Sequence, residues 1–190
     1  MSEIKIVDKF INPRDHEELQ TVMLQREFPW TVAQKTGDMD INGNSNDPLN
    51  TQLNHWFADY RNVHYSPFFK YVLPIVNEQR IIAISRIKAN LQLCTEKPMK
   101  SDYHVDQSLR YGIQEIPEPH LTNIVYYVNS NNGYTEFETG EKVESVANRA
   151  VIFSNTLRHR GVSQTDTHYR TVINLNLCLS EAAAPVFPGG

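Results

Sequence analysis

An alternating stretch from Arg86 to Cys94 constrains the fold more than any other part of this 190-residue chain. Apolar residues occupy every second position, and polar residues occupy the positions between them. The apolar set is Ile87, Ala89, Leu91 and Leu93, and the polar set is Arg86, Lys88, Asn90 and Gln92. Because successive side chains of a strand point to opposite faces, this period predicts a strand with one apolar face. We expect N-terminal helices to cover that face, and the polar face to meet solvent or a polar cleft.

Further strand-like segments follow this one to the end of the chain. They are Asp102 to Gln107, Thr122 to Asn129, Tyr134 to Glu138, Arg149 to Ser154, and Tyr169 to Leu179. Turn-forming clusters of Asn, Ser, Gly and Thr separate them. Short strands with regular turns indicate a sandwich or jelly roll rather than a parallel α/β sheet. We therefore predict a mostly β fold of the α+β class, with N-terminal helices packed on one sheet.

The N-terminal third is predicted to be mainly helical. A short strand at Ile4 to Phe10 precedes a helix over Arg14 to Glu27, which Asn12 and Pro13 would start. Two further helices are expected over Thr51 to Tyr60 and over Ser66 to Gln79, the second kinked or shortened by Pro74.

We expect one domain over residues 1–190. Residues 1–80 would form helical support, residues 81–180 the jelly-roll core, and residues 181–190 a flexible tail. Residues 34–50 are rich in Gly, Asn, Asp and Ser. Such a segment orders itself weakly, so it is either a mobile surface loop or a lid over the site.

Composition excludes several classes of function. The net charge is −4, with 40% hydrophobic and 21% charged residues, which argues against a general nucleic-acid binder. No apolar run approaches the roughly 18 residues of a membrane span, and no signal peptide is evident, so we predict a cytoplasmic protein. Cys94 and Cys178 lie in apolar runs and are predicted to be reduced core residues, with a disulfide between them as the alternative.

Candidate metal ligands stand at His104 and Asp106. On an extended strand these two side chains share a face, and His159 could add a second imidazole. Two histidines and one carboxylate form the facial set that holds iron(II) and leaves coordination positions open. The pair alone is a weak signal, and we expect the other five histidines to be structural or surface residues.

Arg170 strengthens this interpretation. It lies 11 residues after His159, at the start of an apolar strand. Burying a guanidinium is costly unless it pairs with an anion. That anion is either an acidic side chain or the carboxylate of a small-molecule cosubstrate.

With these residues, the chain resembles the iron(II)- and 2-oxoglutarate-dependent dioxygenases, particularly their prolyl-4-hydroxylase-like branch. The resemblance covers Arg86 to Leu177 and extends through Leu121 to Asn129, Gly133 to Phe137, and Ala150 to Phe153. Two departures are a single glycine at Gly133, where the family usually has two, and Thr171-Val172 in place of a serine two residues after Arg170.

The resemblance implies a double-stranded β-helix with iron(II) on His104, Asp106 and His159. It further implies that Arg170 and Tyr127 bind the distal carboxylate of 2-oxoglutarate. Asn174 and Asn176 share the strand face of Arg170 and are predicted to line the pocket. Asn123 and Asn174 are additional candidates for cosubstrate contact.

The implied reaction uses dioxygen to hydroxylate an unactivated C–H bond and yields succinate and carbon dioxide. Ascorbate is a candidate reductant. Asp106 favours hydroxylation, because halogenases of this fold carry a small residue at that position. The resemblance suggests a prolyl residue in a peptide or a small molecule as the primary substrate. Two alternatives stay open: a non-enzymatic β-sandwich binding domain, and a cupin-like metalloprotein of another activity.

Overall fold

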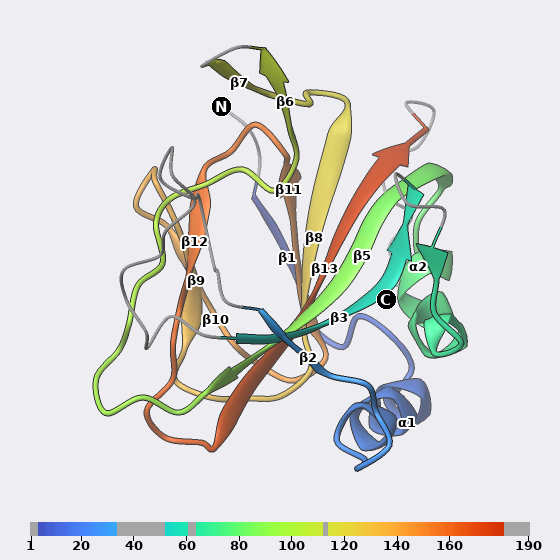
Figure 1. The fold of residues 1–190 in the computed structure, drawn as a ribbon, viewed down its shortest axis with the longest axis vertical. Coiled ribbons are helices and arrows are strands. Elements are labelled where there is room, and N and C mark those ends of the chain that lie inside the picture. The colour runs from blue at the N-terminus through green and yellow to red at the C-terminus, as the bar shows by residue number, and fades with distance from the viewer. Residues whose placement is uncertain (1–3, 34–51, 61–63, 112–113, 181–190) are drawn as a thin grey trace.

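Antiparallel sheets dominate the computed structural model, which describes residues 4–33, 52–60, 64–111 and 114–180 (Figure 1). The large sheet has eight strands in the order β1-β11-β8-β13-β5-β3-β2, with β4 paired to β3. Its strands are β1 (Lys5–Val7), β2 (Thr31–Ala33), β3 (Gln52–Asp59), β4 (His64–Tyr65), β5 (Ile81–Leu93), β8 (Leu121–Tyr127), β11 (Arg149–Ser154) and β13 (Tyr169–Leu179).

A three-stranded sheet faces the large one. Its strands are β9 (Tyr134–Phe137), β10 (Lys142–Glu144) and β12 (His159–Val162), in the order β10-β9-β12. A separate two-stranded ribbon consists of β6 (Ser108–Tyr111) and β7 (Gln114–Pro117). The helices are α1 (Pro13–Met23), the 3-10 helix η2 (Phe69–Val72) and α2 (Leu73–Asn77).

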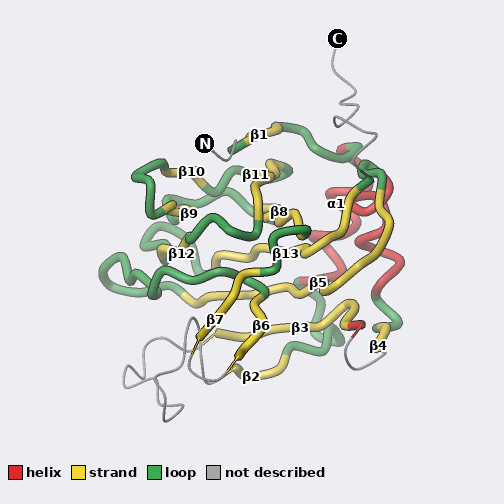
Figure 2. Tube along the Cα trace, turned by 90° about the horizontal axis from the view of Figure 1, so that it is seen from above, coloured by secondary structure: helices red, strands yellow, loops and turns green. Residues whose placement is uncertain are grey.

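The helices and the small sheet lie on opposite faces of the large sheet (Figures 1 and 2). Strand β8 shows how the sequence produces this layering. Its Ile124 and Tyr126 belong to the core beneath the helices, whereas Val125 and Tyr127 belong to the core between the two sheets. Alternate residues of one strand thus enter two different cores. The prediction of a mostly β protein with N-terminal helices on one sheet is confirmed.

The predicted helix over Thr51 to Tyr60 is wrong, because Gln52–Asp59 form β3. The register shifts between Trp56 and Ala58, so that Phe57 and Ala58 both enter the helix-side core. A bulge of this kind breaks the period of two and gives the segment an irregular apolar pattern. Strands β1 to β4 also mean that the described residues before position 80 are not mainly helical.

The other predicted helices are shorter than expected. Helix α1 begins as predicted, with the Asn12 side chain accepting a hydrogen bond from the Arg14 amide at 2.9 Å, but it ends at Met23. The segment after Ser66 forms only η2 and α2, and Pro74 lies in the first turn of α2. The predicted loop or lid at 34–50 and the predicted tail at 181–190 lie outside the described residues.

The cysteine prediction is partly wrong. Cys94 and Cys178 are both free thiols, but Cys94 is exposed because it follows the end of β5, where the apolar face is no longer covered. Within the described ranges, no helix is long and apolar enough to cross a membrane.

Candidate metal centre

His104, Asp106 and His159 converge between the two sheets. Their ligand atoms all lie within 4.8 Å of one another. The Nε2 atoms of His104 and His159 are 4.0 and 3.9 Å from the Asp106 carboxylate oxygens. The structure thus brings together the three residues predicted as metal ligands.

The backbone conformation that positions these three side chains differs from the predicted strand. The segment from Asp102 to Gln107 is not a strand: His104 makes a single antiparallel bridge with His159, and Asp106 follows in a bend. In that bridge each histidine amide donates to the other's carbonyl at 3.0 Å. The two imidazoles therefore lie side by side because their backbones pair, with ring centroids 4.9 Å apart.

Backbone carbonyls hold both imidazoles in one tautomer. Nδ1 of His104 lies 3.0 Å from the Asp102 carbonyl, and Nδ1 of His159 lies 3.3 Å from the Leu157 carbonyl. A carbonyl can only accept, so in the neutral form of each imidazole Nδ1 carries the proton and Nε2 keeps its lone pair. Both lone pairs are thereby available on the side of Asp106, which is the arrangement a metal ligand needs.

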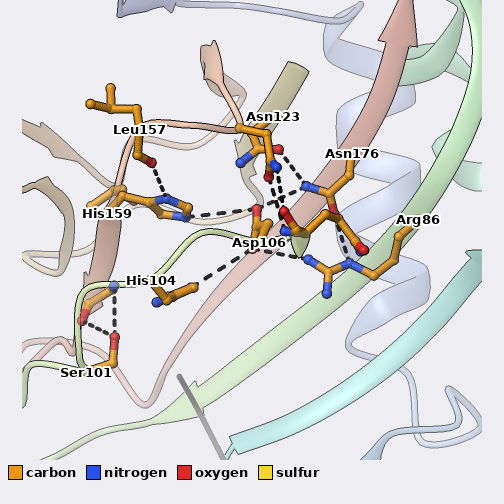
Figure 3. A network of polar contacts seen from close by, with 12 residues as sticks. Arg86, Ser101, His104, Asp106, Asn123, Leu157, His159 and Asn176 are labelled. Atoms are coloured by element: carbon orange, nitrogen blue, oxygen red, sulfur yellow. Dashed lines mark hydrogen bonds and ion pairs between the residues drawn. The ribbon is translucent and has the colours of Figure 1, made fainter. Parts of the chain in front are cut away.

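Asp106 is held by two residues that belong to the large sheet (Figure 3). Arg86 Nη2 on β5 lies 3.1 Å from Oδ1, and Asn176 Nδ2 on β13 donates to Oδ2 at 3.1 Å. Asn176 also accepts from Arg86 Nε at 2.8 Å and donates to Asn123 Oδ1 at 2.7 Å. This network fixes the carboxylate and connects the large sheet to the two histidines.

Sequence reasoning missed the part played by Arg86. The alternation of β5 placed Arg86 on the polar face, but no local pattern says which residue that face meets. Asn176 was predicted to line the pocket, and in the structure it contacts the candidate ligand Asp106.

The charge state of the cluster suits a divalent cation. Burial by itself would raise the pKa of the Asp106 carboxyl, but Arg86 and the two histidines, together with the Asn176 hydrogen bond, hold it well below its usual range. Burial lowers the pKa of His159 to about 4, against the opposing effect of Asp106. His159 is therefore neutral at pH 7, and its contact with Asp106 is not an ion pair. One anionic carboxylate and a neutral buried imidazole are the forms that bind metal.

Arg170 lies buried beyond this cluster, on β13. Its Nε donates to Ser145 Oγ at 2.9 Å and its Nη2 to Thr135 Oγ1 at 3.4 Å. Its guanidinium lies 5.8 Å from the ring centre of Tyr127. Within the described part of the chain it makes no ion pair, so of the two anions considered from sequence, an acidic side chain is not found there. Burial lowers the pKa of Arg170.

Gly133 makes room for the Arg170 side chain, and Gly161 lies beside its guanidinium. A Cβ at Gly133 would lie 2.8 Å from Arg170 Cδ and 2.8 Å from the Val162 carbonyl, so a side chain there would collide with both. A Cβ at Gly161 would lie 3.7 Å from Arg170 Nη1. Gly161 is two residues after His159 on β12, a separation of roughly 7 Å along a strand. The Arg170 guanidinium therefore lies beside the strand that also carries the candidate ligand His159.

The other residues predicted to contact the cosubstrate lie either near Arg170 or near the candidate metal ligands. The Tyr127 hydroxyl donates to Thr135 Oγ1 at 2.8 Å, and so reaches Arg170 through a shared hydroxyl. Asn123 lies at the metal end, and its Nδ2 is buried without a hydrogen-bond partner. Asn174 is half-buried on the same face of β13 as Arg170 and Asn176, between them.

Solved structures with this architecture include several oxygenases. A prolyl-4-hydroxylase from Pseudomonas putida has a TM-score of 0.60 at 12% identity, over 94% of this chain and 94% of that one. A viral collagen prolyl hydroxylase from Paramecium bursaria Chlorella virus-1, in complex with 2-oxoglutarate, has a TM-score of 0.57 at 11% identity, over 94% and 96%. The chain has the fold of the 2-oxoglutarate/iron(II) oxygenases.

Another solved structure with this fold has a small molecule bound besides 2-oxoglutarate. HygX from Streptomyces hygroscopicus, with nickel, 2-oxoglutarate and hygromycin B bound, has a TM-score of 0.57 at 10% identity, over 95% of this chain and 84% of that one. Comparison with protein-family models and with curated proteins finds no match.

The residues present fit iron(II) and 2-oxoglutarate. Two imidazole lone pairs and a carboxylate around one point match the donor set of non-haem iron(II) sites. The unpaired Arg170 guanidinium provides the cation that a distal carboxylate requires.

Proposed function

We propose that this protein is an iron(II)- and 2-oxoglutarate-dependent oxygenase that hydroxylates an unactivated C–H bond, and that its two facing sheets form a double-stranded β-helix. One observation carries the proposal: a buried guanidinium, without an ion pair in the described structure, lies beside the strand that carries His159 of a largely buried His-Asp-His cluster. Neither a binding sandwich nor a cupin-like site of other chemistry explains both features together.

His104, Asp106 and His159 would hold the metal from one side and leave its other positions open. Bound iron(II) would supply the activation of dioxygen and the removal of hydrogen from substrate. Arg170 would bind the distal carboxylate of 2-oxoglutarate, while Thr135 and Tyr127 align the guanidinium and close the pocket against water. Arg86 and Asn176 would keep Asp106 ionised and in place, so that the metal charge is balanced by a carboxylate of fixed orientation.

The primary substrate is proposed to be a prolyl residue in a peptide or a small molecule, with succinate and carbon dioxide as coproducts. Solved neighbours support both choices: a prolyl hydroxylase from Trichoplax adhaerens is in complex with a peptide fragment, and HygX is bound to hygromycin B. Peptide and metabolite pools incubated with the enzyme, screened for a gain of one oxygen, would select between them.

Anaerobic titration tests the cofactor assignment. Purified protein with iron(II) should develop a weak visible charge-transfer band when 2-oxoglutarate is added, and admission of air should then yield succinate. Asp106→Asn and His159→Ala should lose the band, whereas His120→Ala, an exposed histidine elsewhere, should keep it. Folded wild-type protein that shows neither the band nor succinate would exclude the proposal.

A further inference from the structure

The polar face of β5 continues past Arg86 into a basic wall, which we define as Trp56, Arg86 and Lys88. Trp56 on β3 is the direct cross-strand neighbour of Lys88, so the two side chains share this face. The Lys88 ammonium lies 5.5 Å and the Arg86 guanidinium 6.0 Å from the centre of the Trp56 ring. Two cations thus gather over one aromatic ring beside the candidate metal centre.

Lys88, unlike Arg86, makes no ion pair with any residue that the structure describes. It is half-buried, and burial together with the neighbouring Arg86 lowers its pKa to about 8. The anion that acts on it is Asp106, which already accepts from Arg86 and Asn176. A lysine placed beside another cation in a partly dry site costs free energy unless an anion arrives to pair with it.

The net charge of the whole polar face also favours an anionic ligand. Among the described residues, Arg86, Lys88 and Arg170 face this interior from β5 and β13, against Asp106 and the buried Asp59, which lies opposite Arg86. A divalent metal and a doubly charged cosubstrate would cancel each other. The whole face, with three cations against two carboxylates, would then still carry a net positive charge.

We propose that the basic wall is the subsite that binds a carboxylate of the primary substrate, an inference that rests on the proposed function. Lys88 pairs with the carboxylate, Trp56 contacts the adjoining apolar part of the substrate, and Arg86 adds positive potential while it holds Asp106. Lys88 pairs with Asn174 across the sheet, and the next pair on the same face is Arg86 with Asn176. A carboxylate bound to Lys88 is therefore adjacent to the residues that hold Asp106. The primary substrate is accordingly an acid.

A matched pair of ligands tests this subsite. Benzoate and benzamide have the same shape and differ in charge. Their binding to the anaerobic complex with iron(II) and 2-oxoglutarate is measured by calorimetry. Wild-type protein should bind benzoate about tenfold to a hundredfold more tightly, the range expected for a hydrogen bond to a charged group.

Lys88→Met should remove that preference, and Lys88→Arg should retain most of it. The matched control is Lys70→Met, since Lys70 also lies over an aromatic ring, at 4.8 Å from Tyr71, but on the exposed surface. Lys88→Met should leave the charge-transfer band and the affinity for 2-oxoglutarate unchanged.

Equal binding of benzoate and benzamide by the wild type, or an unchanged preference in Lys88→Met, would overturn the proposal. So would a loss of 2-oxoglutarate affinity in Lys88→Met that matches its loss of benzoate affinity, because Lys88 would then belong to the cosubstrate. Failure of the oxygenase function itself is read separately, as a missing charge-transfer band in the wild type.

Discussion

Arg170 shows at the scale of one residue how burial indicates a ligand. Its guanidinium is buried against hydroxyl groups and an aromatic ring. Arg170→Ala should weaken 2-oxoglutarate binding about tenfold to a hundredfold, because a charged hydrogen-bonded contact is lost, and should leave iron(II) affinity nearly unchanged. Anaerobic titrations with each ligand measure the two affinities. Arg149→Ala, which removes a guanidinium paired with Asp8, is the control. An equal loss of 2-oxoglutarate and iron(II) affinity in Arg170→Ala would mean that Arg170 is structural.

Arg86 compensates the charge of a buried carboxylate. The Asp106 side chain is 5% exposed and that of Arg86 13%. Arg86→Met should therefore lower the free energy of unfolding of the metal-free protein by about 3 kcal/mol, since it leaves a buried charge unpaired. Urea unfolding measures the change. The double variant Arg86→Met with Asp106→Asn should recover most of the loss, and a double variant no more stable than the single one would contradict this account.

At the scale of elements, α1 is joined to β8 through a half-buried histidine. Nδ1 of His16 lies 2.6 Å from the Tyr126 hydroxyl, which donates to Asn148. Burial lowers the pKa of His16 below its unfolded value of about 6.5. Above that pH His16 is neutral in both the folded and the unfolded protein, so it has no effect on the pH dependence of stability. Below it the unfolded chain takes up a proton that the folded protein resists, so the free energy of unfolding falls as pH decreases.

His16→Gln should reduce this loss of stability below about pH 6.5. Urea unfolding at a series of pH values measures the slope for the variant and the wild type. Part of the slope should persist, because burial lowers the pKa of His159 in the same direction. A His16→Gln slope equal to that of the wild type would mean that His16 titrates alike in both states.

At the scale of the whole molecule, the candidate metal centre connects the two sheets. His159 belongs to the small sheet, whereas Asp106 is held by Arg86 and Asn176 of the large sheet. A divalent metal that binds only the folded protein should raise stability by about 2.7 kcal/mol at a hundredfold excess over its Kd. Thermal unfolding with and without manganese(II) measures the increase. His159→Ala should abolish it and His120→Ala should not; an equal increase in both variants would place the metal elsewhere.

The sequence by itself determined those features that depend on a local period. The strands at Arg149–Ser154 and Tyr169–Leu179 begin and end as predicted, because alternation is a property of consecutive residues. The candidate ligands could be chosen because His104 and Asp106 stand two residues apart and because Arg170, downstream of His159, stands in an apolar strand. The helix predicted over β3 failed because a bulge, which depends on pairing with β5, broke that period.

Only the tertiary structure decided how the candidate site is assembled. His104 meets His159 through a backbone bridge between segments 55 residues apart, and not through a strand that carries both His104 and Asp106. Arg86 reaches Asp106, and Lys88 meets Trp56, because β5 lies between β13 and β3. The physical reason is that alternation determines the face on which a side chain lies, whereas the identity of its neighbour across the sheet depends on strand order and register, which are set by contacts distant in sequence.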